Sequence, residues 1–375
     1  MKKVLIISYS PLSRDPRIRR QIECLKETHE IIAVGQDNPQ IEGVKYIEYP
    51  RFMADNSDRL RYIISILTKS YEKYYWSKYT ELYKVLNNES FDFIISNDPD
   101  PLPLVARLAQ EKNIKFLADM HEYSPRENDG NLKWRLFFKA FRTYLCKKYL
   151  KSASAVTTVC QGIAEEYRKE MGIDKISIIT NSPKRTNTPV RKPIGNTIRI
   201  VHHGVAAPSR KIEAMLNMMN YVDSRFTLDV YLVPGEIDYI NKLKNQFGRA
   251  NNINFKEPVE YDKINDMLSQ YDIGLFILYP SNFNYLHALP NKLFEFAQAR
   301  LAIAIGPSPE MVRYISKYKC GIVAKDFTSK SMADQLNRLT FEELQSYKQN
   351  ANKLAIEECT EKNMEKLKQI IEDLI

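Results

Sequence analysis

Short apolar runs alternate with longer stretches of helical periodicity along most of the chain, and this alternation limits the possible folds more than any other feature. Most of the runs are largely apolar, as expected for strands that are covered on both faces. The pattern predicts an α/β protein whose parallel sheets carry helices on both sides. The strands predicted in residues 3–183 are Val4–Ile7, Ile31–Gly35, Phe91–Ser96, Lys115–Ala118, Val156–Val159 and Ile176–Thr180. Those predicted further on are Ile198–His202, Leu228–Val233, Ile253–Phe255, Ile273–Leu278, Ala302–Ile305 and Gly321–Ala324.

A polar stretch separates two halves that show the same alternation. Residues 181–197 hold three prolines and one glycine among mostly polar residues, which is typical of an interdomain linker. A chain of 375 residues is long enough for two domains with separate cores. We predict a first domain at 1–183, a linker at 184–197, a second domain at 198–353 and a C-terminal helix at 354–375.

Composition and charge exclude several classes of protein. No run of eighteen apolar residues is present to span a bilayer, and the N-terminus lacks the length and cleavage site of a signal peptide. Five scattered cysteines without a C-x-x-C pair favour a reducing compartment, so we expect a cytoplasmic protein without disulfides or zinc. The net charge of +9 fits nucleic acid, an anionic membrane or anionic substrates. No nucleic-acid-binding motif is found, so we expect no nucleic-acid partner.

The loop after the first predicted strand bears on cofactor use. Residues 8–20 contain no glycine, so the fingerprint of NAD-dependent oxidoreductases is missing. Asp15 and Pro16 instead predict the cap and the first residue of a helix.

The stretch Tyr285–Glu295 has the features of an anion site. It follows an apolar strand and opens a predicted helix at Asn291–Ala299, with Pro290 at its start. The first-turn N–H groups of a helix can hold an anion, and Lys292 adds a positive charge there. Glu295 lies one turn further on, on the same face. This arrangement suits a nucleotide diphosphate whose ribose hydroxyls bind the carboxylate.

The run LPNKLFEF at Leu289–Phe296 resembles the nucleotide-sugar site of retaining glycosyltransferases of family 4, which have the GT-B fold. The resemblance implies two Rossmann-like domains whose parallel sheets face a central cleft, with the acceptor bound by the first domain and the donor by the second. It also implies a final helix that crosses back to the first domain. In the family, the residue at the position of Glu295 holds the donor ribose. The implied donor contacts in this helix are Asn291, Lys292, Leu293 and Glu295.

A second motif lies at the start of the second domain. His203-Gly204 followed by Ser209-Arg210-Lys211 resembles the family's glycine loop and basic pair. The resemblance assigns Gly204 to the donor loop and Lys211 to the diphosphate, and because Val205 replaces an arginine, we take Arg210 as the second cation. Two cations would neutralise the diphosphate, so no metal ion or other cofactor is expected.

The first domain carries a matching motif. Asp119-Met-His121-Glu122 resembles the Asp-x-His-Glu of this group, in which the histidine reaches the donor sugar. His121 is therefore a catalytic candidate, although such a histidine can also be satisfied by the backbone. Glu122 and Glu127 are candidates for the acceptor side. Arg14, Arg17 and Arg20 are candidates to face the cleft, Arg14 on the acceptor side, with a solvated basic helix face as the alternative.

Two features depart from the family pattern or offer another interpretation. His287 stands where the family often has a second glutamate, eight residues before Glu295, and is a second catalytic candidate. Asp98-Pro-Asp100 is similar to the metal-binding pair of GT-A enzymes, but the prolines at 99 and 101 favour a turn that leads into a helix at 103–112.

Two segments combine cations with aromatic residues. Residues 132–151 contain seven cations, no anion and an aromatic stripe at helical spacing, which fits a helix on an anionic membrane surface. A stripe that is ordinary core is the alternative. Residues 59–88 are also basic and aromatic, and we expect them to be divided between core and acceptor side.

The function that the resemblance implies is transfer of a hexosyl or N-acetylhexosaminyl group, with retention, from a nucleotide sugar to a hydroxyl of a glycan or lipid-linked acceptor. UDP-sugars are the commonest donors of the family, and surface polysaccharide or glycoconjugate synthesis is the expected pathway. The expected place is the cytoplasm, with peripheral attachment to the inner leaflet as a possibility. Two alternatives stay open: a nucleotide-sugar 2-epimerase of the same fold, and a non-catalytic partner that binds the nucleotide sugar.

Overall fold

The computed structural model describes residues 1–50, 55–193 and 195–375, and the chain divides into two compact units. Unit 1 contains Met1–Thr180, Asn282–Asn284 and Asn363–Ile375, and unit 2 contains Asn181–Ser281 and Tyr285–Lys362. The stretch predicted as a linker, 184–197, thus clusters with unit 2.

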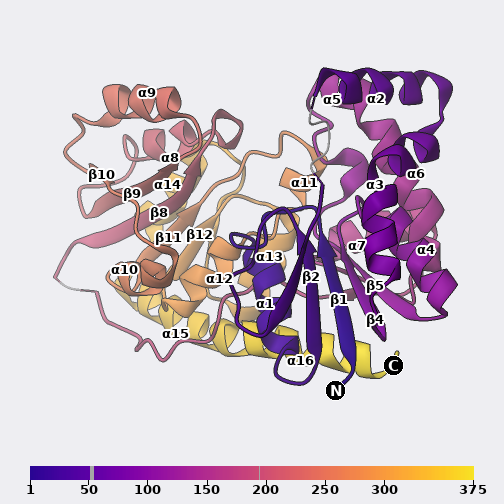
Figure 1. The fold of residues 1–375 in the computed structure, drawn as a ribbon. Helices are drawn as coiled ribbons and strands as arrows, with labels where there is room; N and C mark the ends of the chain where they lie inside the picture. The colour runs from indigo at the N-terminus through magenta and orange to yellow at the C-terminus, as the bar shows by residue number, and fades with distance from the viewer. Residues whose placement is uncertain (51–54, 194) are drawn as a thin grey trace. The chain divides into compact units, whose positions relative to one another are not determined.

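Unit 1 is built on a parallel sheet in the strand order β3-β2-β1-β4-β5-β6-β7, with its helices packed around it (Figure 1). The inner strands are largely apolar because both faces are covered, and Val4, Leu5, Ile6 and Ile7 have no exposed surface. The strands are β1 (Lys3–Ser8), β2 (Glu30–Gly35), β3 (Val44–Glu48), β4 (Phe93–Asn97), β5 (Lys115–Met120), β6 (Ala155–Thr158) and β7 (Ile176–Ile178). The helices are α1 (Pro16–Leu25), α2 (Asn56–Thr68), α3 (Tyr71–Asn87), α4 (Leu102–Lys112), α5 (Leu132–Phe137), α6 (Lys139–Tyr149) and α7 (Gln161–Met171).

Unit 2 repeats this plan with a parallel sheet in the order β10-β9-β8-β11-β12-β13. The predicted α/β class with two parallel sheets is therefore confirmed. The strands are β8 (Ile198–Ala206), β9 (Phe226–Pro234), β10 (Ile253–Lys256), β11 (Ile273–Phe276), β12 (Ala302–Ile305) and β13 (Gly321–Val323). The helices are α8 (Glu213–Met218), α9 (Ile237–Phe247), α10 (Ile264–Leu268), α12 (Asn291–Gln298), α13 (Pro309–Tyr318), α14 (Ser329–Arg338) and α15 (Phe341–Glu357). The short helix α11 (Phe283–Leu286) is divided between the two units.

One strand was not predicted from the sequence. β3 pairs only with β2, so it forms the edge of its sheet, and all its residues keep some exposure. Its run VKYIE mixes polar and apolar residues and contains no long apolar stretch, which fits a half-buried edge.

The last helix, α16 (Thr360–Glu372), begins in unit 2 and contributes its later residues to unit 1. Asn363 Oδ1 accepts a hydrogen bond of 3.1 Å from the backbone N–H of Thr180. Met364, Leu367 and Ile371 are buried in the unit 1 core that also contains residues of β1 and α1. The end of the chain is thus part of the core around the first strand.

The basic segment 132–151 forms two helices with different surroundings. On α6, Phe141 and Leu145 are buried, and Arg142 forms an ion pair with Asp100, so its aromatic stripe is core. On α5 no residue is buried. The tyrosines of the neighbouring segment 59–88 also lie largely in the core, as shown by Tyr62, Tyr71, Tyr74, Tyr75 and Tyr79.

We expect Leu367→Ala to lower the free energy of unfolding of unit 1 by about 2–4 kcal/mol, because it leaves a cavity in this core. Both tryptophans, Trp76 and Trp134, lie in unit 1, so their fluorescence during urea unfolding reports on that unit. Ile375→Ala is the control, since Ile375 is 40% exposed, and it should change stability by less than about 0.5 kcal/mol. Equal effects of the two substitutions would show that α16 does not stabilise unit 1.

Candidate functional site

Gly204 and Lys292 meet at the carboxyl end of β8. Gly204 has φ +130°, a conformation that favours glycine, and a Cβ atom built there would lie 2.5 Å from Lys292 Nζ. The lysine side chain therefore occupies the space that any larger residue at 204 would fill. The sequence brings both residues into the candidate site, and the structure places them in contact.

The charge around Lys292 is unbalanced. Burial lowers the pKa of Lys292, the nearby positive charge of Arg210 lowers it further, and the carboxylate of Glu295 offsets only part of this, leaving a pKa of about 8. Its Nζ lies 5.1 Å from the centroid of the Phe276 ring. An anion bound here would relieve the repulsion between the two cations.

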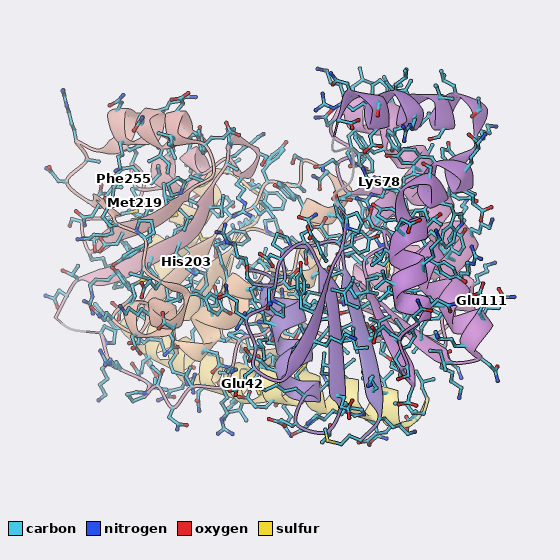
Figure 2. All side chains as sticks on the ribbon, in the orientation of Figure 1. Glu42, Lys78, Glu111, His203, Met219 and Phe255 are labelled. Carbon is cyan, nitrogen blue, oxygen red and sulfur yellow. The ribbon has the colours of Figure 1, made fainter. Side chains whose placement is uncertain are left out.

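Glu295 lies beside a histidine whose role the sequence did not reveal. His203 Nε2 is 3.2 Å from Glu295 Oε2, and both side chains are largely buried. The ring of His203, which is labelled in Figure 2, also packs edge-on against the ring of Phe296, with 5.6 Å between the two centroids. The position of His203 next to Gly204 was the only sequence signal for this contact.

The first turn of α12 has fewer backbone N–H groups available to bind an anion than expected. Pro290 is the cap rather than the first helical residue, and the N–H of Leu293 bonds to the Pro290 carbonyl at 3.2 Å. The Leu293 side chain is 1% exposed and belongs to the core. In a helix the N–H groups of the first residues lack intrahelical partners, which leaves those of Asn291 and Lys292 for an anion.

The two cations of the basic pair, Arg210 and Lys211, have different surroundings. Arg210 Nη1 donates a 3.3 Å hydrogen bond to the carbonyl of Val205, close to Gly204. Lys211 is exposed, has φ +48°, and its Nζ lies 3.6 Å from the centroid of the Tyr279 ring. Arg210 is thus the cation coupled to Lys292, while the Lys211 amine is held by an aromatic face.

His287 has a carboxylate partner. Its Nδ1 lies 3.3 Å from Glu310 Oε1, and the Glu310 side chain is 2% exposed in the first turn of α13. The sequence did not indicate this pair, because 23 residues separate Glu310 from His287 and no local pattern links them.

In unit 1, His121 follows β5 and is surrounded by acceptors. Nδ1 lies 3.3 Å from Asp98 Oδ2, and Nε2 lies 3.3 Å from Asn97 Oδ1 and 3.6 Å from Asp119 Oδ2. Burial alone would lower the pKa of His121, but the charge of Asp98 and the bond to Asp119 raise it above its usual value. The imidazolium, which donates from both nitrogens, is therefore favoured.

The three arginines near the start of α1 differ in exposure. Arg14 is exposed, whereas Arg17 and Arg20 are only 4% and 7% exposed. Arg17 binds Asp119 through Nε at 2.7 Å and Nη2 at 2.6 Å, so it is a buried structural partner. The expectation of a solvent-facing basic run is wrong for Arg17 and Arg20, because the helix turns them into the core. Asp15 does cap the helix as predicted, accepting from the N–H of Arg17.

The acidic candidates of unit 1 have raised pKa values, although Glu122 is exposed and the Glu127 side chain is 35% exposed. Burial, and then the charges of Glu127 and Asp98, raise the pKa of Glu122 to about 7, and Asn284 Nδ2 donates to it at 3.1 Å. Burial also raises the pKa of Glu127, whose Oε2 lies 3.7 Å from Arg142 Nε.

The carboxylates of the Asp-x-Asp run have separate cationic partners. Asp98 binds His121 and Asp100 binds Arg142. Within the described ranges, no cluster of three or more His, Cys, Asp or Glu side chains is arranged to hold a metal ion. None of the helices in those ranges is both long and apolar enough to cross a bilayer.

The whole chain resembles known GT-B structures. HepE of Anabaena, solved in complex with UDP, superposes with a TM-score of 0.72 at 11% identity, and each chain is covered completely. Sucrose-phosphate synthase of Thermosynechococcus elongatus gives 0.69 at 14% identity, with 100% of this chain and 99% of that one covered. WaaG, a glycosyltransferase involved in lipopolysaccharide biosynthesis, gives 0.63 at 14% identity, covering 98% and 99%. The chain therefore has the GT-B glycosyltransferase fold.

The family model agrees with this class. Residues 19–182 match the model described as Glycosyltransferase Family 4, so the resemblance predicted from the motifs is confirmed. No curated protein sequence matches the chain.

We expect Lys292 to react with acetic anhydride as an amine whose pKa is about 8. In Gly204→Ala the new methyl group displaces Nζ toward water and away from Arg210, which should return the pKa of Lys292 toward its ordinary value. The measurement is the pH profile of labelling of the Lys292 peptide by mass spectrometry. Gly43→Ala is the control, because Gly43 also has a positive φ but open space around it. An unchanged profile in Gly204→Ala would contradict the contact.

Proposed function

We propose that this protein is a glycosyltransferase that takes a sugar from a nucleotide diphosphate donor, with a UDP-sugar favoured. The observation that carries the proposal is the group formed by Lys292, Gly204 and Arg210 beside Glu295. It combines two coupled cations, a backbone position without a side chain and a carboxylate one turn away. A nucleotide diphosphate needs each of these features. The cations attract its phosphates, the glycine lets the phosphates approach the backbone closely, and the carboxylate accepts hydrogen bonds from the ribose hydroxyls.

The chemistry of transfer explains why such a site would be preorganised. Negative charge builds on the diphosphate as its bond to the sugar breaks, and fixed cations and helix N–H groups stabilise that charge without reorganising. Lys292, Arg210 and the start of α12 supply these groups, with Lys211 as a further candidate. Two coupled cations can neutralise the diphosphate, which supports a reaction that needs no metal ion.

We assign His121 the role implied by the family, a hydrogen-bond donor toward the transferred sugar. Both ring nitrogens lie near acceptors of unit 1, Nδ1 near Asp98 and Nε2 near Asn97, so the ring must exchange one of these contacts for the sugar. Glu122, Glu127 and Arg14 remain candidates for the acceptor side. The raised pKa of Glu122, about 7, fits a group that exchanges a proton near neutrality.

His287 and Glu310 bear on the alternative of a non-catalytic partner. The family often places a glutamate at the position of His287, and here the Glu310 carboxylate lies 3.3 Å behind the ring. Glu310 can fix the Nδ1–H tautomer and leave Nε2 to bind a sugar hydroxyl. The Glu310 carboxylate thus keeps a negative charge next to the ring of His287, and this favours an active enzyme.

The finer proposal is transfer of a hexosyl or N-acetylhexosaminyl group, with retention, to a hydroxyl of a glycan or lipid-linked acceptor. HepE structures contain UDP, UDP with glucose, or UDP-glucose, and WaaG acts in lipopolysaccharide synthesis. These likenesses support a UDP donor and a role in making surface polysaccharides or glycoconjugates.

Calorimetric titration with UDP, GDP, ADP and dTDP, each with and without EDTA, tests the donor site. We expect UDP to bind equally well with EDTA, and Glu295→Ala to weaken binding about 10–100-fold through loss of charged hydrogen bonds to the ribose. Glu260→Ala, at an exposed glutamate of unit 2, is the control and should bind as wild type. Absence of binding by any nucleotide would favour the non-catalytic alternative, and binding abolished by EDTA would refute the metal-free site.

The pH dependence of UDP binding tests the role of Lys292 separately. Its pKa is about 8 in the free protein, and a bound diphosphate would raise it. Binding should therefore be tightest where Lys292 is already charged and weaken up to about tenfold as the pH rises from about 7 to about 9. Near pH 8 the complex should take up protons, as seen by calorimetry in buffers of different ionisation enthalpy.

Substitution by arginine isolates this effect. Lys292→Arg keeps the charge but does not titrate in this range, so UDP binding by that variant should not change with pH. Lys211→Arg is the matched control and should keep the wild-type pH dependence. The same pH dependence in Lys292→Arg would assign it to another group.

A further inference from the structure

Exposed apolar side chains are concentrated on two helices of unit 1. Among the described residues, nineteen large apolar side chains are exposed, and seven of them lie on α2 and α5. Large apolar residues that gather on one surface mark an interaction site, whereas single ones are ordinary. The seven are Leu60, Ile63, Ile64, Leu67, Leu132, Leu136 and Phe137.

The four residues on α2 form one stripe. Leu60, Ile63, Ile64 and Leu67 follow the i, i+3, i+4, i+7 spacing of a single helix face, and they are 40–78% exposed. The opposite face, with Tyr62 and Ser65, is buried. The helix thus turns an apolar face outward although its inner face already packs on the unit.

Cations flank this stripe on both sides. At 3.6 residues per turn, Arg59 and Arg61 lie about 100° to either side of Leu60. Of the acidic residues at this helix, Asp55 caps it, and Asp58 forms ion pairs with Lys78, which Figure 2 labels, and at 3.9 Å with Arg61. The outward face is therefore apolar at its centre and positive at its edges.

α5 extends this surface. The Tyr62 hydroxyl donates to the Phe137 carbonyl at 3.0 Å, and Figure 1 shows α2 and α5 side by side at the same end of unit 1. Leu132 and Leu136 are each 61% exposed and lie one turn apart. The exposed cations of this segment, for which no carboxylate partner is found among the described residues, are Lys133, Arg135 and Lys139.

We propose that the outward face of α2, together with α5, docks the protein on an anionic lipid bilayer. A helix that lies in the interface buries an apolar stripe among the acyl chains while flanking arginines and lysines bind headgroup phosphates. Charge complementarity selects this occupant, because the rim contains several cations and its acidic residues are engaged in a cap and in ion pairs. This surface shares only the exposed start of the segment expected at 132–151, since the stripe of α6 is core. The inference needs no nucleotide site and stands apart from the proposed donor.

Sedimentation of the full chain with lipid vesicles tests this surface. We expect binding to vesicles that contain phosphatidylglycerol, little binding to phosphatidylcholine alone, and weaker binding at high salt. Ile64→Gln/Leu67→Gln should reduce the partition coefficient more than tenfold. Lys133→Glu/Lys139→Glu should reduce it by at least about 25-fold, since each cation near an anionic leaflet contributes about fivefold.

Matched variants separate the surface from general effects. Ile237→Gln/Ile356→Gln removes two exposed apolar residues from helices of unit 2 and should sediment as wild type. Circular dichroism should show all variants folded, and UDP titration reports on the donor site independently of the vesicles. No binding of wild type to anionic vesicles, or equal binding by Ile64→Gln/Leu67→Gln, would overturn the proposal. So would a dimer of the free protein that this variant abolishes, because the face would then belong to a second copy.

Discussion

The ion pair between Arg17 and Asp119 holds together the carboxyl end of the sheet in unit 1. Both side chains are almost fully buried, and Arg17 also donates to the carbonyl of Ile179 at 2.9 Å. Asp119 accepts two further bonds, from Gln21 and Thr157. Loss of either charge would leave the other unpaired in the interior, at a cost of about 3–5 kcal/mol. The same carboxylate lies beside His121, so the pair that joins α1 to β5 also positions the candidate catalytic ring.

Unit 2 has a balanced pair at one end of its sheet and unbalanced cations at the other. Lys348 Nζ bonds to Asp272 Oδ1 at 3.0 Å just before β11, where both side chains are buried. At the carboxyl end, Lys292 lies near Arg210, and burial followed by their repulsion lowers the pKa of the lysine. A paired charge stabilises the fold, whereas a crowded pair of cations stores free energy that an anion can release. This difference between the two ends supports the donor site that we propose at the carboxyl end.

The sequence predicts what is local. Continuous apolar runs such as Val4–Ile7 identify the inner strands, because burial on both faces leaves no alternation to mistake for another pattern. Asp15 marks a helix start through its own bonds to the next turn. The half-buried edge β3 escapes such a search, since its run is neither continuously apolar nor long.

Local sequence patterns do not predict contacts between residues that are far apart in the sequence. The sequence indicates Glu295 and His287 as site residues but not their partners His203 and Glu310, because the fold alone brings these pairs to about 3.3 Å. Arg17 belongs to a run that looks solvent-facing, yet its partner Asp119 lies 102 residues away. Residue types predict which chemistry is present, and the topology decides which groups meet.

Helical periodicity likewise does not predict whether the apolar stripes of α2 and α6 are buried or exposed. Both helices carry an apolar stripe, but Phe141 of α6 is core while Leu67 of α2 is 78% exposed. Tyr62 explains the difference, because its ring lies 5.2 Å from that of Tyr74 and 5.7 Å from that of Phe141. These contacts bury the stripe of α6 and fix the rotation of α2, whose other face must then point outward. The apolar surface that we assign to a bilayer is thus a direct consequence of how the aromatic core of unit 1 packs.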